Sequence, residues 1–183
     1  VIDSVGQRNS GTKILFKADP SFFDTEKISG KYLSNSLKAK AVLCPGLKIK
    51  FKDEVNKIKE EWCFVDGLGK YLSTSLGEGE YLPNEPIEGE FEDEENSLAW
   101  AVAWELRDQE SITESYVNLI PTIQGGTHVA GMRTGITDAL KEFCEYRNLI
   151  PKGVKVTAED VWKNASYVLS AKLKDPQFSG QTK

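Results

Sequence analysis

The chain has 183 residues, a formal net charge of −5 at pH 7 and 39% hydrophobic residues. This length suits one compact domain, and the apolar content is enough to fill one core. No stretch approaches the roughly 18 consecutive apolar residues that a membrane-spanning helix needs. Residues 1–5 carry neither a basic region nor a long apolar region, and they lack an initiator methionine. We therefore expect a fragment of a longer chain rather than a secreted precursor.

Cysteines and charges narrow the chemistry further. Three cysteines occur without paired spacing, at Cys44, Cys63 and Cys144. Their odd number argues against a disulfide framework and for a reducing compartment. Because no C-x-x-C motif accompanies the single histidine, we interpret the cysteines as buried apolar thiols rather than zinc ligands. Basic residues dominate 7–59 and acidic residues dominate 78–114; a nucleic-acid surface is one explanation, but composition favours a solvated polar surface.

Apolar periodicity in the first half of the chain predicts short strands and two helices. Residues 1–10 are expected to form a polar N-terminal connecting segment. The predicted elements are then a strand at 13–17, a helix at 29–43, a strand at 47–52, its partner strand at 61–65 and a helix at 68–76. Apolar and basic residues alternate strictly over 47–52, which predicts a half-buried strand with a basic outer face. That outer face carries Lys48, Lys50 and Lys52.

The second half of the chain is richer in strands. The predicted elements are a loop at 77–86, a hairpin of strands 88–92 and 98–106, a strand at 115–120, a helix from Thr127 to about Asn148, a helix at 157–162 and a strand at 167–173. Within 98–106 the tryptophans share one face and the alanines share the other, so this strand should be central in its sheet. Thr127 is predicted to cap the long helix, and Thr157 with Asp160 is predicted to form a capping box.

This mixture of helices and antiparallel strands predicts an α+β fold rather than a regular alternation of strands and helices. We expect a mixed, mainly antiparallel sheet with helices packed on one face. In particular, the helices that begin near Ser29 and Thr127 are expected to share one face of the sheet. The alanines of the strand at 98–106 leave room for a close helix.

No hydrolytic constellation is evident, because a Ser-His-Asp or Cys-His site would have to centre on His128. His128 lies at the start of a predicted helix, where satisfying free N–H groups is the simpler role. Neither a G-x-x-x-x-G-K-S/T loop nor a G-x-G-x-x-G motif is present. Gly125-Gly126 could bring a helix N-terminus towards phosphate, but two glycines before a helix usually form only a turn.

Two segments carry a more specific pattern. Residues 175–183 are small and polar and end in Gln181-Thr182-Lys183, and residues 116–128 run from a strand into Gly-Gly-Thr-His. They resemble the Q-T-K loop and the G-G-T-H segment of the gyrase-type topoisomerases, GHKL-family ATPases that open and close double-stranded DNA. The motifs keep their order from about Gly6 to Lys183. Residues 37–46 and 142–148 are more similar to the B-subunit of topoisomerase IV than to the B-subunit of gyrase.

The resemblance implies a domain organisation. In this family the matching region is the transducer domain, which lies between an ATP-binding domain and a C-terminal metal-binding domain. Residues 11–176 would form this domain, and its mixed sheet would contain a left-handed βαβ crossover. Residues 177–183 would be a truncated loop that contacts ATP, and we expect this loop to be mobile without nucleotide and the ATP-binding domain. The fragment alone is expected to be inactive.

The resemblance also implies the chemistry. Lys183 is the implied catalytic residue, with its ammonium against the γ-phosphate of ATP, and Gln181 and Thr182 complete the cofactor contact. ATP and Mg²⁺ are implied cofactors of the whole protein, with no metal ligand expected in this fragment. The implied partners are double-stranded DNA, the A-subunit of topoisomerase IV and a second copy of the chain, joined through the N-terminal ATPase domain. The implied location is the bacterial cytoplasm.

DNA contacts and other functions remain open at this point. Five basic residues are candidates for loose contacts with DNA phosphates: Lys48, Lys50, Lys52, Arg133 and Arg147. Exposed solubilising charge explains each of them equally well. One alternative is the equivalent domain of the gyrase B-subunit or of a mismatch-repair ATPase, although the joint presence of G-G-T-H and Q-T-K argues against mismatch repair. Another alternative is a stand-alone interaction module whose acidic segment 88–95 binds a basic partner.

Overall fold

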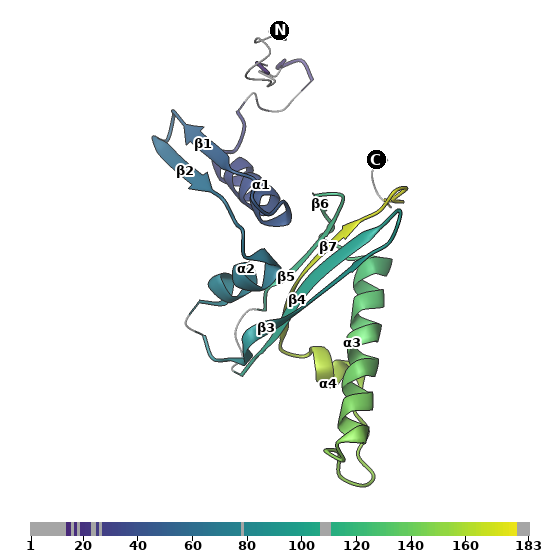
Figure 1. Cartoon of the computed structure of the whole chain (residues 1–183). Coiled ribbons are helices and arrows are strands. Elements are labelled where there is room, and N and C mark those ends of the chain that lie inside the picture. The colour runs from purple at the N-terminus through teal and green to yellow at the C-terminus, as the bar shows by residue number, and fades with distance from the viewer. Residues whose placement is uncertain are drawn as a thin grey trace.

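The computed structural model describes residues 14–15, 17, 19–22, 25, 27–77, 79–106 and 111–178. The helices are α1 (Gly30–Leu43), α2 (Gly67–Leu76), α3 (Thr127–Tyr146) and α4 (Ala158–Trp162). The strands are β1 (Ile49–Asp53), β2 (Ile58–Trp62), β3 (Tyr81–Glu92), β4 (Ser97–Glu105), β5 (Thr113–Val117), β6 (Ile120–Pro121) and β7 (Ala165–Lys172). Figure 1 shows a central sheet with α1 and α2 on one side and α3 and α4 on the other. The predicted α+β class is confirmed.

Within the described residues, five strands form the main sheet, in the order β3-β4-β7-β5-β6, while β1 pairs with β2 in a separate two-stranded sheet. β5 and β7 are parallel, and the other described pairs are antiparallel. The predicted mixed, mainly antiparallel sheet is therefore confirmed. The chain passes from β5 to its parallel neighbour β7 through β6, α3 and α4. The left-handed sense of this crossover stays a prediction.

The two faces of β4 bury two separate apolar clusters. On one face Ala101 packs against α1 and α2, where its neighbours include Leu72. On the other face Val102 packs against α3 and α4, where its neighbours include Met132. Because β4 is apolar on both faces, each face needs its own helical layer. The prediction that α1 and α3 share one face is therefore wrong, whereas the central position of β4 is confirmed.

Short-range signals explain where the helices begin. The Ser29 hydroxyl oxygen accepts a hydrogen bond from the backbone N–H three residues on, at 3.2 Å, and so caps α1. Thr157 and Asp160 form the predicted capping box before α4. The N-cap of α3 is Gly126 rather than Thr127, so that prediction is wrong. Gly126 has a φ of 153°, which residues with a Cβ rarely adopt.

Several strand boundaries differ from the predictions. β3 begins at Tyr81, within the predicted loop 77–86; it is an edge strand, where a proline removes no ladder hydrogen bond on its free side. The single strand predicted at 115–120 is instead two antiparallel strands, β5 and β6. β2 is the predicted partner of β1, but it begins and ends earlier than the expected range 61–65 and overlaps it only at Glu61 and Trp62. Of the strand predicted at 13–17, the described residues Ile14, Leu15 and Lys17 are not in a strand; the others lie outside the described residues.

Candidate functional site

Three segments meet at the end of the sheet where β7 finishes. Ser97, the first residue of β4, is paired with Lys172, the last residue of β7. Val117, the last residue of β5, is paired with Ala171. The β3–β4 turn and the β5–β6 turn therefore flank the point where the chain leaves the sheet towards the C-terminus (Figure 1). We call Leu173–Phe178, which follows β7, the tail root.

Asn118 holds the first residue of the tail root with both ends of its side-chain amide. Its Nδ2 donates to the Leu173 carbonyl, and its Oδ1 accepts from the Leu173 N–H, each at 2.9 Å. The backbone N–H of Asn118 also donates to the Ala171 carbonyl at 2.8 Å. No role for Asn118 is predicted from the sequence. The one available signal is its residue type, since asparagine tolerates left-handed backbone directly after a strand.

The β5–β6 turn also contacts helix α1. Asn118 and Leu119 have φ angles of 48° and 67°, and the flanking residues Val117 and Ile120 are paired. They therefore form a two-residue hairpin turn of the type that needs left-handed backbone at both positions. The Lys40 ammonium, in the last turn of α1, donates to the Leu119 carbonyl at 3.1 Å. This hydrogen bond connects α1 directly to the sheet edge that carries the tail root.

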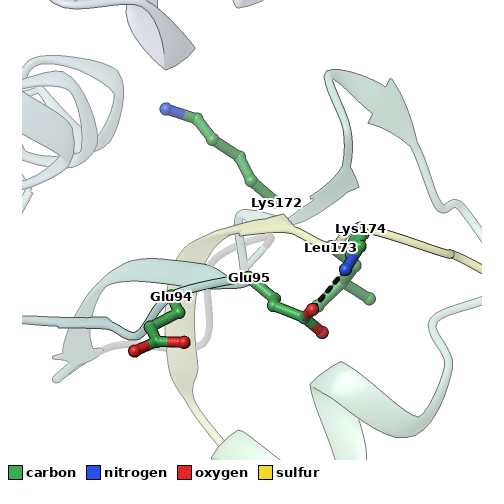
Figure 2. Close-up of a pocket in the computed structure, with 5 residues that line it drawn as sticks. All are labelled: Glu94, Glu95, Lys172, Leu173 and Lys174. Atoms are coloured by element: carbon green, nitrogen blue, oxygen red, sulfur yellow. Dashed lines mark hydrogen bonds and ion pairs between the residues drawn. The ribbon is translucent and has the colours of Figure 1, made fainter.

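The β3–β4 turn lies on the other side of the tail root. Lys174 forms an ion pair with Glu95 of this turn, and Lys172 points away from the pair (Figure 2). The five residues drawn in Figure 2 line a shallow cavity of about 350 Å³. Asp93 Oδ1 accepts hydrogen bonds from the backbone N–H groups of Glu95 and Asn96 at 2.8 and 2.7 Å. These bonds hold the pKa of Asp93 below its usual value and fix the turn.

His128 fastens the start of α3 to the main sheet. Its Nε2 lies 2.9 Å from Thr122 Oγ1, which lies 2.7 Å from Ser115 Oγ on β5. Burial lowers the pKa of His128, so the neutral ring is favoured. A nucleophile–base pair would also need a group that orients the ring, and the described residues place no carboxylate on its other nitrogen. His128 therefore bonds a hydroxyl rather than the free N–H groups expected.

The lysine face of β1 matches the predicted pattern. Phe51 is buried on one face of the strand, and the lysine side chains on the other face are exposed. Each lysine has an acidic neighbour, because Lys48 and Lys50 lie 3.2 and 3.4 Å from Glu61 and Lys52 lies 2.5 Å from Glu54. Exposed pairs of this kind contribute little to stability. They partly neutralise the face that was predicted to contact DNA.

The two arginine candidates lie on a different part of the molecule. Arg133 is in α3 and lies over the Trp162 ring, 5.2 Å from its centroid. Arg147, the C-cap of α3, lies over the Phe143 ring at 5.8 Å. Since α3 and α1 cover opposite faces of the main sheet, the five candidates do not form one surface (Figure 1). Contact between any of them and DNA stays a prediction.

The implied ATP-contacting residues Gln181, Thr182 and Lys183 lie outside the described residues. Gln177 and Phe178, at the end of the tail root, have no regular secondary structure. The roles of the three terminal residues, and the mobility expected of this segment, stay predictions. What the structure does define is the anchored start of the segment that carries them.

Other predictions concern thiols and metals. Cys63 is exposed, while Cys44 and Cys144 are partly exposed, so the prediction of three buried thiols is wrong. In the part of the chain that the structure describes, the histidine, cysteine and acidic side chains form no group of three that could hold a metal ion. None of the described helices is long and apolar enough to cross a bilayer.

Comparison with known proteins identifies the family of this chain. A sequence model described as DNA gyrase B matches residues 67–183. This chain belongs to the DNA gyrase B family. Curated relatives in the comparison are the B-subunits of DNA topoisomerase 4 from Salmonella typhimurium, Pseudomonas aeruginosa and Escherichia coli, which are 53%, 52% and 51% identical over 183 residues. Each alignment covers 100% of this chain but 29% of the relative, so the chain spans under a third of their length.

Solved structures of related proteins support the same family assignment. The topoisomerase IV ATP binding domain of Francisella tularensis, in complex with a small molecule inhibitor, aligns with a TM-score of 0.79 and 44% identity over 100% of this chain and 49% of that chain. The 43K ATPase domain of Thermus thermophilus gyrase B, in complex with an aminocoumarin, aligns with a TM-score of 0.74 and 24% identity over 88% of this chain and 44% of that chain, which supports the fold alone. The family-model match begins at Gly67, the first residue of α2. The predicted boundaries 1–10, 11–176 and 177–183 stay predictions.

Proposed function

We propose that the chain is part of the B-subunit of topoisomerase IV, an ATP-hydrolysing type II topoisomerase, and that residues 11–176 act as its transducer domain. In this role the chain relays ATP binding and hydrolysis to DNA strand passage. The observation that carries the proposal is 53% identity, across all 183 residues, to the B-subunit of DNA topoisomerase 4 from Salmonella typhimurium. Decatenation and supercoil relaxation belong to the whole enzyme, since the chain spans 29% of that relative.

The donor chemistry of the tail suits a polyphosphate. Lys183 provides a compact ammonium, Gln181 an amide N–H and Thr182 a hydroxyl, and each of these groups donates to phosphate oxygens. Bound ATP with Mg²⁺ supplies the phosphoryl group that is hydrolysed. Lys183 stabilises the negative charge that develops on the transferred group, because a positioned cation favours that charge more in the transition state than in the ground state.

The tail root fixes one end of the segment that carries Lys183. Lys183 follows Leu173 by ten residues, so its Cα lies at most about 35 Å from Leu173 even in a fully extended chain. Asn118 and the Lys174–Glu95 pair hold the first two residues of the tail root against the sheet. A segment tied to the sheet at one end and to nucleotide at the other is a latch that hydrolysis releases.

The partners of the whole enzyme are proposed on the same basis. They are double-stranded DNA, the A-subunit of topoisomerase IV and a second copy of the B-subunit joined through the N-terminal ATPase domain, in the bacterial cytoplasm. We assign the basic residues of β1 and α3 only a supporting role towards DNA. Each of them already has a partner within the chain, so their contacts with DNA phosphates would be loose and sequence-independent.

ATP turnover by the full-length protein, with Lys183 intact or changed to alanine, tests the proposal. We expect Lys183→Ala to lower kcat by at least about a hundredfold, the scale of one charge-stabilising group, while a non-hydrolysable ATP analogue still binds. The matched control is Lys152→Ala, an exposed lysine in the connection between α3 and α4, which should leave both quantities unchanged. Turnover by Lys183→Ala at the wild-type rate would refute the assignment of the tail.

A further inference from the structure

We infer that Asn118 and Lys40 are positioning residues for the C-terminal tail: through the β5–β6 turn they couple helix α1 to the tail root. The inference deepens the proposed function and rests on it, because it concerns how the segment that carries Lys183 is directed. Asn118 lies in segment 116–128 and Lys40 lies in segment 37–46, both of which carry the family resemblance, but the resemblance assigns a role to neither residue. Both are singled out by hydrogen bonds between segments far apart in sequence.

In the first step of the coupling, the side chain of Asn118 continues the hydrogen bonding to the chain after β7 once strand β5 has ended. The parallel β5–β7 ladder ends with the pair Val117 and Ala171. Beyond it the backbone of Asn118 turns left-handed, with a φ of 48°, and leaves the ladder. The side-chain amide then takes over, since it donates to and accepts from Leu173 as a further strand residue would. Among side chains of this length only asparagine offers both a donor and an acceptor in one planar group.

The second step is the contact from the opposite side of the turn. Lys40 Nζ donates to the carbonyl of Leu119, the residue next to Asn118. Lys40 and Leu119 are both half-buried, and Leu119 packs against the cluster between the sheet and helices α1 and α2. A charged donor in a partly water-excluded place makes a stronger bond than an exposed one. The turn is therefore held by α1 on one side and holds the tail root on the other.

The third step is the stiffness of the connection. The turn has only two residues, both in the left-handed region, and it is closed on either side by paired strand residues. A displacement of α1 relative to the main sheet cannot be absorbed by a long loop. It passes through Lys40 to the Leu119 carbonyl and through Asn118 to Leu173. The direction in which the tail leaves the sheet is thus linked to the position of α1.

The experiment uses the full-length protein with three substitutions and a matched control. Asn118→Ala removes both bonds to Leu173, Asn118→Asp keeps the acceptor and loses the donor, and Lys40→Met keeps the side-chain stem and loses the charge. Asn148→Ala is the control: Asn148 also has a left-handed backbone, with a φ of 52°, but it follows the C-terminal end of α3, whereas the tail root follows β7. The measured quantities are kcat, the Kd of a non-hydrolysable ATP analogue and the thermal unfolding midpoint.

We expect Asn118→Ala and Lys40→Met to lower kcat by about fivefold, the scale of one hydrogen bond of positioning, with the Kd of the analogue unchanged. Asn118→Asp should fall between wild type and Asn118→Ala. Asn148→Ala should share the part of the stability loss that comes from alanine at positive φ, but should keep the wild-type kcat. Adding Asn118→Ala to Lys183→Ala should cause no further loss, because a positioning residue acts only through the group that it positions.

The outcomes separate this inference from the proposed function. If Lys183→Ala abolishes turnover while Asn118→Ala and Lys40→Met keep the wild-type kcat, the coupling is refuted and the proposed function stands. If Lys183→Ala leaves turnover unchanged, both are refuted. An equal loss of kcat in Asn118→Ala and Asn148→Ala also refutes the coupling, because it would trace the effect to backbone strain in both turns.

Discussion

Gly89 on β3 offers a sharp test of how the main sheet packs. Gly89 is paired with Trp100 on β4, and the indole ring covers it so closely that an added Cβ would lie 2.3 Å from Trp100 Cζ2. Gly89→Ala therefore displaces an indole that packs against the cluster beneath α3. Such overpacking costs about 1–3 kcal/mol, and the lower entropy of the unfolded alanine variant offsets about 0.4–1 kcal/mol of it. The two ranges together leave a net loss of about 0–2.6 kcal/mol, and the rigidity of the indole ring places the expected loss in the upper half of this range.

Gly69→Ala is the matched comparison for Gly89→Ala. A Cβ at Gly69 in α2 would lie 2.1 Å from Glu88 Oε1, which is nominally closer. Glu88 is an exposed, flexible side chain that can rotate away, and alanine is favoured over glycine within a helix by about 1 kcal/mol. Urea unfolding followed by far-ultraviolet circular dichroism should therefore show Gly69→Ala as stable as wild type or more stable. A Gly89→Ala variant with wild-type stability would refute the view that Trp100 is held rigidly over the strand.

Two further predictions concern single side chains. Burial lowers the pKa of His128 in the folded chain, so the unfolded state binds its proton more tightly; stability is full above pH about 6.5 and falls as the pH decreases from there. Thermal unfolding midpoints between pH 7.5 and 5.5 should show this fall, and His128→Gln should flatten it, because the chain has no other histidine. Thr157→Ala removes the hydroxyl that accepts from the Asp160 N–H, but it keeps the reciprocal bond from the backbone N–H of residue 157 to Asp160 Oδ2. It should lower the free energy of unfolding by about 1 kcal/mol. Urea unfolding checks this value, and an unchanged midpoint would show that the threonine hydroxyl does not stabilise α4.

Periodic segments were the part of the fold that could be predicted from sequence. The apolar stripe of α3, the capping box of α4 and the two apolar faces of β4 all depend on residues close together in the chain. Periodicity reveals how many faces of a strand are buried, but it carries no information about which helix covers which face. The placement of α1 and α3 on one face was wrong for this reason.

The errors in β3 and β5 have local physical causes. Pro83 and Pro86 favoured a loop, yet an edge strand tolerates residues without an N–H, and edge position is a property of the whole sheet. The turn between β5 and β6 is formed by Asn118 and Leu119 rather than the Asn-Gly pair that signals such turns. Leu119 accepts left-handed backbone while also packing into the core, which the sequence alone does not reveal.

The candidate site was predictable only in part. The terminal Gln-Thr-Lys motif could be recognised by resemblance, but the anchoring of the tail depends on strand register. Asn118 reaches Leu173 only because β5 and β7 are parallel neighbours that end together. Lys40 reaches Leu119 only because α1 lies on the same side of the sheet as this turn. The Asn118–Leu173 and Lys40–Leu119 contacts join residues that are 55 and 79 positions apart in the sequence. No local sequence pattern can therefore predict them.

The position of β7 has a consequence for the order in which the chain folds. β7 lies between β4 and β5, so among the described strands it is the one neighbour that the β3–β4 hairpin and the β5–β6 hairpin share. During synthesis both hairpins leave the ribosome before β7 does, and neither can bury its apolar faces against it. Val168 and Leu169 of β7 are fully buried, one in each cluster. Both apolar clusters are therefore completed at the same time, when β7 inserts between β4 and β5. A nascent chain that stalls before β7 is synthesised exposes incomplete, apolar sheets to chaperones and proteases.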